Sequence, residues 1–270
     1  MVICPICHQN LRMEQRSWHC ENNHSFDVAR QGYVNLLPVQ QKHSIAPGDT
    51  REMVVARREV LDLGHYLPIA NTLRDCVQKY APDAQTILDA GCGEGYYLSQ
   101  LSHIENRWAI DISKQAVRYA AAREKTAHWL TATAAHLPFA DHSFDCVLSM
   151  FAFTAEAEFA RILKEDGIFI QVLAGEKHLS SLKKIIYPEI FEKEKDLQPK
   201  LSGFTLLESR PISFEFTLND SESIRNLLYM TPHVHRISKA GADALAKTTC
   251  LSNRAEVVFN VYQVDKKQKI

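Results

Sequence analysis

The chain has 270 residues, of which 46% are hydrophobic and 23% are charged. This is the composition of an ordinary globular protein, with room for one α/β domain of about 200 residues and a small second module. A formal net charge of −1 gives no sign of a strongly basic protein that binds polyanions. No apolar run approaches the roughly 18 residues of a transmembrane helix, and the first residues lack the pattern of a signal peptide. We therefore expect a cytoplasmic protein with no membrane partner.

The first segment with a chemical pattern contains three of the seven cysteines. Cys4 and Cys7 form a CxxC pair. Cys20 follows after twelve intervening residues, and His24 after three more. Two such pairs can complete a tetrahedron, and three thiolates with one imidazole favour zinc over harder metals. The alternative is a redox-active CxxC pair, but no predicted strand precedes Cys4 and no helical pattern follows Cys7.

Two other histidines, His8 and His19, compete with His24 for the fourth position. His19 adjoins Cys20, and one backbone step makes joint binding of a single ion awkward, so we prefer His24. Four protein ligands leave no open position for a catalytic water. We therefore expect a structural zinc ion, which supplies the folding free energy that about twenty residues cannot gain by burial alone.

The next part of the chain reads as a connection followed by two helices. Residues 31–49 contain glycines and prolines without sustained periodicity, which indicates an extended segment with turns. Asp49 or Thr50 can cap a helix that carries the adjacent pair Arg57 and Arg58. A second helix is predicted over about residues 68–80. We divide the chain into a zinc-binding module, a linker with its connecting helix, and a main domain, at residues 1–34, 35–64 and 65–270.

A glycine-rich loop follows a short apolar strand predicted over residues 86–90. The loop, Gly91-Cys-Gly-Glu-Gly95, leads into a helical segment over residues 96–103, and this order favours a nucleotide-binding loop. A second strand ends about twenty residues later at Asp111, whose carboxylate can accept both hydroxyls of a ribose. The alternative role for Asp111 is to cap the helix that begins near Ser113.

Two cofactors compete for this loop. A dinucleotide fingerprint needs a third glycine where this chain has Tyr96. Asp89 precedes the loop and Glu94 lies within it, and their negative charge suits a sulfonium and an ammonium better than a pyrophosphate. The alternative for both acids is a capping role. The loop favours S-adenosylmethionine (SAM).

Four segments in chain order resemble the motifs of the class I SAM-dependent methyltransferases: residues 88–95, Asp111, residues 137–148 and residues 162–169. The resemblance covers roughly residues 85–175. It implies an α/β fold with a Rossmann-like, seven-stranded sheet behind the small zinc-binding domain. It also implies cofactor contacts at Asp89, Gly91, Gly93, Glu94 and Asp111, with Thr133 and Ala134 beside the adenine.

The whole chain is similar to a narrower family, the bacterial 23S ribosomal RNA guanine-N1 methyltransferases. The similarity rests on the cysteine and histidine spacing of residues 4–24, on residues 32–39, and on residues 56–58 with 64–66. It implies methyl transfer from SAM to N1 of a guanine in a domain II hairpin of 23S rRNA. It also implies a zinc module that helps to hold the RNA, and a homodimer with the hairpin in a cleft between subunits. By the same resemblance Tyr66, Gly93, Glu94 and His178 are SAM contacts.

This sequence departs from the family near the acceptor pocket. Phe151-Ala-Phe153 stands where the family tends to carry Tyr-Ala-Pro. A base flipped out of a hairpin loop can stack on Phe151 or Phe153, although both can equally be core residues. Arg57 and Arg58 are the candidates for phosphate contacts. The sequence singles out no general base.

Two other functions fit parts of the sequence. The first is a class I methyltransferase of a small molecule, with a purely structural zinc module; the near-neutral charge favours it and the N-terminal segments oppose it. The second is a non-catalytic RNA-binding protein with a vestigial core, which the intact glycine loop and Asp111 oppose.

Overall fold

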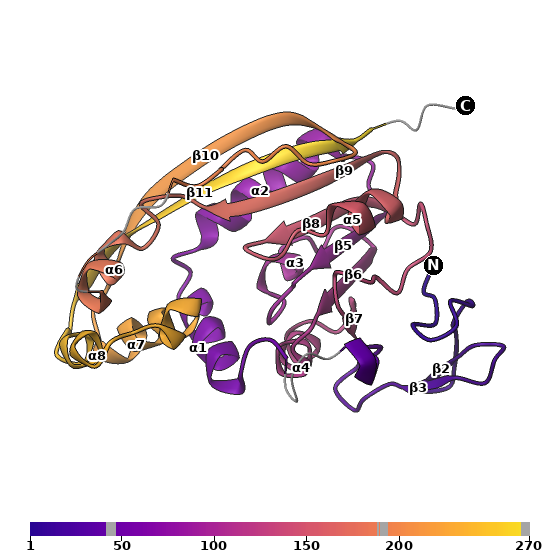
Figure 1. Ribbon diagram of the computed structural model, residues 1–270, viewed down its shortest axis with the longest axis horizontal. Helices are drawn as coiled ribbons and strands as arrows, with labels where there is room; N and C mark the ends of the chain where they lie inside the picture. Colours follow the sequence, from indigo (N-terminus) through magenta and orange to yellow (C-terminus); the bar gives the residue numbers. More distant parts are fainter. Residues whose placement is uncertain (42–46, 188, 190–193, 266–270) are drawn as a thin grey trace.

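An eight-stranded sheet forms the centre of the molecule in the computed structural model, which describes residues 1–41, 47–187, 189 and 194–265 (Figure 1). The strands run in the order β10-β11-β9-β8-β5-β6-β7-β4. Their bounds are β4 (Tyr33–Asn35), β5 (Thr86–Ala90), β6 (Asn106–Asp111), β7 (His128–Thr131), β8 (Phe144–Met150), β9 (Leu163–Ala174), β10 (Phe204–Leu218) and β11 (Leu251–Val264). Neighbours from β9 to β4 are parallel, whereas β11 and β10 join antiparallel. The predicted class I methyltransferase fold is confirmed.

The sheet has one strand more than the seven predicted. β4 lies at its edge and pairs parallel with β7, in the register Tyr33 with Trp129 and Asn35 with Thr131. Tyr33 and Val34 are buried there. The boundary that we placed at residue 34 therefore falls inside a strand of the main sheet. The segment after the zinc module closes the edge that β7 would otherwise expose.

Helices cover both faces of the sheet because its middle strands are apolar on both sides. Their bounds are α1 (Arg51–Asp62), α2 (Leu67–Tyr80), α3 (Tyr96–Ser99), α4 (Lys114–Arg123), α5 (Glu156–Ile162), α6 (Ser180–Ile186), α7 (Ser221–Tyr229) and α8 (Lys239–Ala246). Every residue of β5 is buried. Ile87 belongs to the core cluster that α2, α4, α6 and α7 share, whereas the next residue, Leu88, packs in the cluster of α5 and the N-terminal module.

The two helices predicted before the glycine loop are present. The hydroxyl of Thr50 accepts a hydrogen bond from the backbone N–H of Met53 (3.4 Å) and caps α1, and α2 starts one residue before the predicted position. The helix predicted over residues 96–103 is shorter, because α3 ends at Ser99. The chain then continues in tighter turns, in which the N–H groups of Gln100 and Leu101 donate to the carbonyl oxygens three residues earlier.

The N-terminal residues form a small antiparallel sheet of their own: β1 (Arg12–Glu14), β2 (Ser17–His19) and β3 (Ser25–Asp27). Figure 1 shows it at one end of the molecule, opposite the group of α6, α7 and α8. The module is hydrogen-bonded to the core, since Ile3 N donates to Pro138 O (2.9 Å) and Ala140 N to Met1 O (2.8 Å). Among the described helices, none has the length and apolar character to cross a membrane.

Candidate functional site

The four predicted metal ligands meet in the N-terminal module. The ligand atoms of Cys4, Cys7, Cys20 and His24 all lie within 4.8 Å of one another. Cys7 Sγ lies 3.6 Å from Cys20 Sγ, and the Nδ1 atom of His24 lies 3.4 Å from Cys20 Sγ. A tetrahedron with metal–sulfur bonds of about 2.3 Å has edges of about 3.7 Å, so the site has the size that zinc requires.

The structure also decides between the competing histidines. His24 supplies the fourth atom of the cluster, whereas neither His8 nor His19 belongs to it. The backbone N–H of Gln9 lowers the pKa of the Cys7 thiol to about 6, which favours the thiolate that binds a metal. All four ligands come from protein side chains, which fits a structural ion.

The glycine loop lies at the carboxyl ends of β5 and β6, where ligands bind in open α/β sheets. Gly93 has φ +55° and Gly91 has φ +90°, a region that favours glycine. Asp111 Oδ2 accepts a hydrogen bond from Gly93 N (2.9 Å), and Asp111 Oδ1 accepts one from Ser113 N (2.8 Å). Each oxygen keeps a further lone pair, so the same carboxylate can hold the loop and accept ribose hydroxyls.

Ser113, rather than Asp111, is the N-cap residue of α4, with its hydroxyl accepting from Ala116 N (3.2 Å). Thr133 and Ala134 follow β7 on the neighbouring loop, which is tied to β6 by the hydrogen bond from Ala132 N to Asp111 O (3.1 Å). The two predicted adenine neighbours are thus brought to the same edge of the sheet as Asp111.

Asp89 is a buried carboxyl group that pairs with no described cation. It is 1% exposed, and neither of its oxygens has a hydrogen-bond partner among the described residues. Burial, together with the nearby charge of Asp111, raises the pKa of Asp89 to about 7. The hydroxyl of Tyr66 is also buried and without a partner in the described part of the chain. Such orphaned polar groups are costly, and a bound cation with hydrogen-bond donors would satisfy them. The site therefore fits SAM.

Glu94 already has a partner. Its Oε2 accepts from Arg123 Nε (2.7 Å), and Arg123 also contacts Asp62 (2.8 Å). Glu94 Oε1 remains buried and, within the described residues, without a partner. Burial raises the pKa of Glu94, and Arg123 opposes that shift. One oxygen of Glu94 is thus held by Arg123, and the other is left for a ligand.

The structure places Arg57 at the glycine loop, whereas its neighbour Arg58 lies 3.7 Å from Asp62, one turn further along α1. Arg57 forms an ion pair with Asp49 and donates from Nη2 to Met230 O (3.1 Å). A Cβ atom on Gly93 would lie 3.3 Å from Arg57 Nη1. The Arg57 side chain is 23% exposed and links α1 to the glycine loop and to the residue after α7. Sequence patterns gave no sign of it, because Arg57 comes from a helix far from the loop in sequence.

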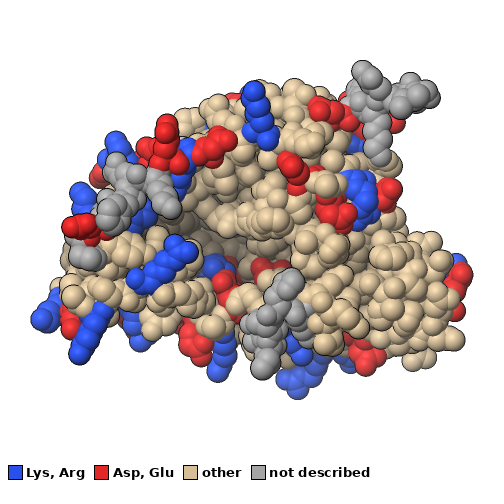
Figure 2. All heavy atoms as spheres, in the orientation of Figure 1, with Lys and Arg blue, Asp and Glu red and all other residues tan. Residues whose placement is uncertain are grey.

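Phe151 and Phe153 lie at the end of β8 and are not core residues, since their exposed fractions are 40% and 70%. The Phe151 ring lies near the rings of both Tyr97 and His178, with centroid distances of 6.3 and 6.0 Å. Burial, with a contribution from Lys183, lowers the pKa of His178 to about 4, so this imidazole is neutral at pH 7. Figure 2 shows that the molecule is hollowed between the sheet and the region of α1 and α7.

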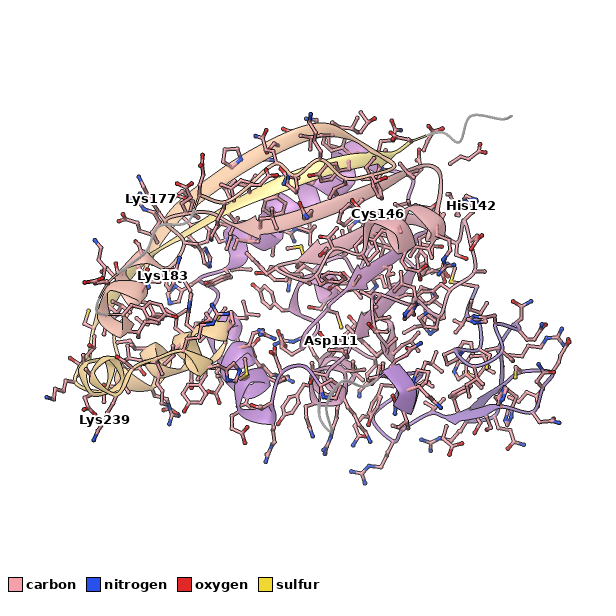
Figure 3. All side chains as sticks on the ribbon, in the orientation of Figure 1. Asp111, His142, Cys146, Lys177, Lys183 and Lys239 are labelled. Carbon is pink, nitrogen blue, oxygen red and sulfur yellow. The ribbon has the colours of Figure 1, made fainter. Side chains whose placement is uncertain are left out.

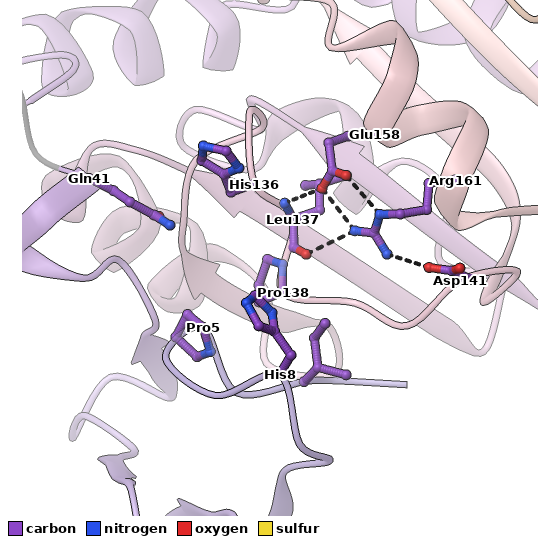
Figure 4. A pocket seen from close by; sticks show the side chains of 10 residues that line it. Pro5, His8, Gln41, His136, Leu137, Pro138, Asp141, Glu158 and Arg161 are labelled. Atoms are coloured by element: carbon purple, nitrogen blue, oxygen red, sulfur yellow. Dashed lines mark hydrogen bonds and ion pairs between the residues drawn. The ribbon is translucent and has the colours of Figure 1, made fainter.

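A second hollow, of about 290 Å³, lies between the zinc module and the loop before β8 (Figure 4). Arg161 dominates one wall, donating to Glu158 Oε1 (2.7 Å) and Phe139 O (2.6 Å). His8 and His136 line it as well. The donors of Arg161 are used to hold this loop in place. We therefore interpret the hollow as part of the packing between the zinc module and the main domain, and assign it no ligand.

Comparison with known proteins agrees with this geometry. A family model described as RlmA, N-terminal, a zinc ribbon, matches residues 2–45, and a methyltransferase domain model matches residues 88–171. Fold and site together define a class I methyltransferase that uses SAM and carries a structural zinc ribbon.

Two relatives identify the family within this class of methyltransferases. A Bacillus subtilis protein, YxjB, named as a candidate 23S rRNA (guanine-N1)-methyltransferase, is 32% identical over 246 residues, which is 86% of each chain. The 23S rRNA (guanine(748)-N(1))-methyltransferase of Streptomyces fradiae is 38% identical over 187 residues, covering 66% of this chain and 65% of that relative. The chain belongs to the family of 23S rRNA (guanine-N1)-methyltransferases.

Proposed function

We propose that the protein transfers the methyl group of SAM to N1 of a guanine in a domain II hairpin of 23S rRNA. The observation that carries the proposal is the union of a zinc ribbon and a SAM-binding core, matched along 86% of a relative whose name carries this activity. In this proposal the protein works in the cytoplasm, where its substrate is made, as a homodimer that holds the hairpin between subunits.

We assign each residue of the cofactor site to a part of SAM from its charge and its free hydrogen-bonding atoms. Asp89 and Tyr66 would face the cationic methionine end of SAM, because their polar atoms are buried without partners among the described residues. Asp111 would accept the ribose hydroxyls, with Gly91 and Gly93 allowing close approach of the ligand. Glu94 would contribute its free oxygen, and Thr133 and Ala134 would flank the adenine. Bound SAM supplies a methyl group activated by its positive sulfur.

The acceptor would lie beside Phe151. The sheet order places β8 next to β5, so the residues after β8 border the cofactor loop. Phe151 and Phe153 would stack on the flipped base, and His178 would bound the pocket on the far side of Phe151. Guanine N1 carries a proton, so forming the new N–CH3 bond requires that proton to leave. Aligning N1 with the methyl group is then the main task of these side chains.

Binding of SAM is expected to release a proton from Asp89. In the free protein Asp89 has a pKa of about 7, so the carboxyl is largely protonated below that pH. Positive charge in the site favours the ionised form, so affinity should rise by up to about tenfold per pH unit between roughly pH 5.5 and 7. Calorimetry in buffers of different ionisation enthalpy measures the proton directly. Asp89→Asn should bind without this dependence, and a flat profile for the wild type would refute the assignment.

The proposed reaction is tested with the full-length protein, methyl-labelled SAM and unmodified 23S rRNA made in vitro. We expect 1-methylguanosine in the digested RNA, at one position in the domain II hairpin. A transcript that lacks this hairpin is the matched control and should stay unlabelled. Label that enters a metabolite extract and no RNA would overturn the proposal in favour of a small-molecule methyltransferase.

A further inference from the structure

A lysine in α6, Lys183, lies half-buried and forms no ion pair within 4 Å with any described acid. Lys183 follows the loop that leaves β9, and its ammonium makes no hydrogen bond or ion pair with any described residue. Its neighbour Lys184 is exposed. Burial, and then the charge of Lys195, lowers the pKa of Lys183. A cation held in this way is destabilised until an anion joins it.

Two further donors, Lys195 and His233, lie near enough for electrostatic interaction with Lys183. The ammonium of Lys195 donates to the carbonyl oxygens of Ala174 (3.0 Å) and Gly175 (3.1 Å), which fixes its position at the end of β9. The Nδ1 atom of His233 lies 2.8 Å from the Tyr187 hydroxyl, on the segment after α7.

Charges that act on Lys183 and His233 include those of Lys195, Arg236 and Glu256. Lys183 lowers the pKa of both His178 and His233, after the larger effect of burial, and Arg236 adds to the effect on His233. The acid that acts on Lys183 is Glu256, whose Oε1 accepts a hydrogen bond from Lys177 N (3.1 Å). Lys and Arg side chains lie over this end of the molecule, interspersed with Asp and Glu side chains (Figure 2).

The cluster borders the acceptor side of the site. The cofactor loop follows β5, Phe151 follows β8, and the loop to α6 follows β9, and these three strands are neighbours in the sheet. His178, in that last loop, lies 6.0 Å from the Phe151 ring. Asp111 lies well away from Lys183 (Figure 3), and among the described residues Arg57 and Arg123 are cations beside the glycine loop. Lys183 thus belongs to the helix that follows β9, the strand next to β8 in the sheet.

We propose that Lys183, with Lys195 and His233, binds a backbone phosphate next to the nucleotide that is methylated. The inference rests on the proposed function, because a base that stacks on Phe151 brings its own phosphates to this side. A phosphate would place its negative charge between two ammonium groups and accept a hydrogen bond from His233. The contact would position the RNA and carry no sequence information.

The test compares Lys183→Gln with Lys184→Gln, which removes the same charge from the exposed neighbouring position. We expect Lys183→Gln to raise the KM for unmodified 23S rRNA about tenfold and to lower the salt slope of RNA binding by about one. Lys184→Gln should change both much less, and Lys183→Arg should restore most of the loss. The affinity for SAM, measured by calorimetry, should be unchanged in all three variants.

Three outcomes would overturn the inference. Equal behaviour of Lys183→Gln and Lys184→Gln, in a wild type that methylates rRNA, would remove the phosphate site and leave the proposed function standing. A loss of SAM affinity in Lys183→Gln would assign the lysine to the cofactor carboxylate. A wild-type protein that neither binds nor methylates the RNA would overturn the site and the proposed function together.

Discussion

Gly93→Val is expected to lower the affinity for SAM by about 100-fold or more. Gly93 has φ +55°, a conformation in which a β-branched residue is strained. A Cβ atom at this position would lie 3.3 Å from Arg57 Nη1, and the valine methyl groups would extend into the space over the loop. The substitution would also disturb the N–H group that Asp111 holds. Isothermal titration calorimetry with SAM measures the loss.

The matched control is Gly203→Val. Gly203 also has positive φ (+80°), but it precedes β10, away from the glycine loop, and a Cβ atom added there would lie 3.7 Å from Ala160 Cβ. It should cost stability and leave SAM affinity within about twofold. Asp111→Ala should give an intermediate result, a loss of roughly 1–3 kcal/mol, because two backbone N–H groups lose a charged acceptor. Unchanged affinity in both Gly93→Val and Asp111→Ala would contradict the site.

Cys20→Ser is expected to remove the zinc ion and with it the fold of the N-terminal module. The strands β1, β2 and β3 have three residues each, and none of their residues is fully buried. Apolar burial alone therefore cannot stabilise this sheet, and the four metal bonds supply the free energy, on the order of 10 kcal/mol in comparable peptides. Elemental analysis should fall from about one zinc per chain to nearly none.

Limited proteolysis locates the effect. Cleavage of Cys20→Ser should concentrate within residues 1–30, while the sheet core stays resistant. Cys250→Ser, at an exposed cysteine outside the metal cluster, is the control and should keep its zinc. A zinc-free wild type, prepared without chelators, would show that the cluster is not a zinc site.

Sequence patterns predicted best the features whose functional residues lie close together in the sequence. The spacing of Cys4 to His24 and the loop Gly91–Gly95 each lie within a short segment, and local geometry almost dictates their roles. The end of α3 was less predictable, because it is set by a few hydrogen bonds in which a backbone N–H donates to the carbonyl oxygen three residues earlier. β4 was missed, since three residues of an edge strand give almost no periodic signal.

Features assembled from distant segments were beyond sequence reasoning. Arg57 and Arg58 were predicted to supply phosphate contacts from the helix between the modules. The position of Arg57 beside Gly93 depends on how α1 packs against α4 and α7, which local periodicity does not encode. The cluster around Lys183 likewise joins residues from α6, the end of β9 and the segment after α7. Only the folded chain brings them together.

The pairing of β4 with β7 also sets the order in which the molecule can be assembled. Residues 1–27 have all four zinc ligands and leave the ribosome before the strands of the main sheet, so the small sheet can form while those strands are still being made. Tyr33 must then wait for Trp129, its neighbour in the register, which is synthesised much later. Until that strand emerges, the segment of β4 stays unpaired behind the zinc module. One edge of the sheet is thus closed by the strand of that sheet that is synthesised before all the others.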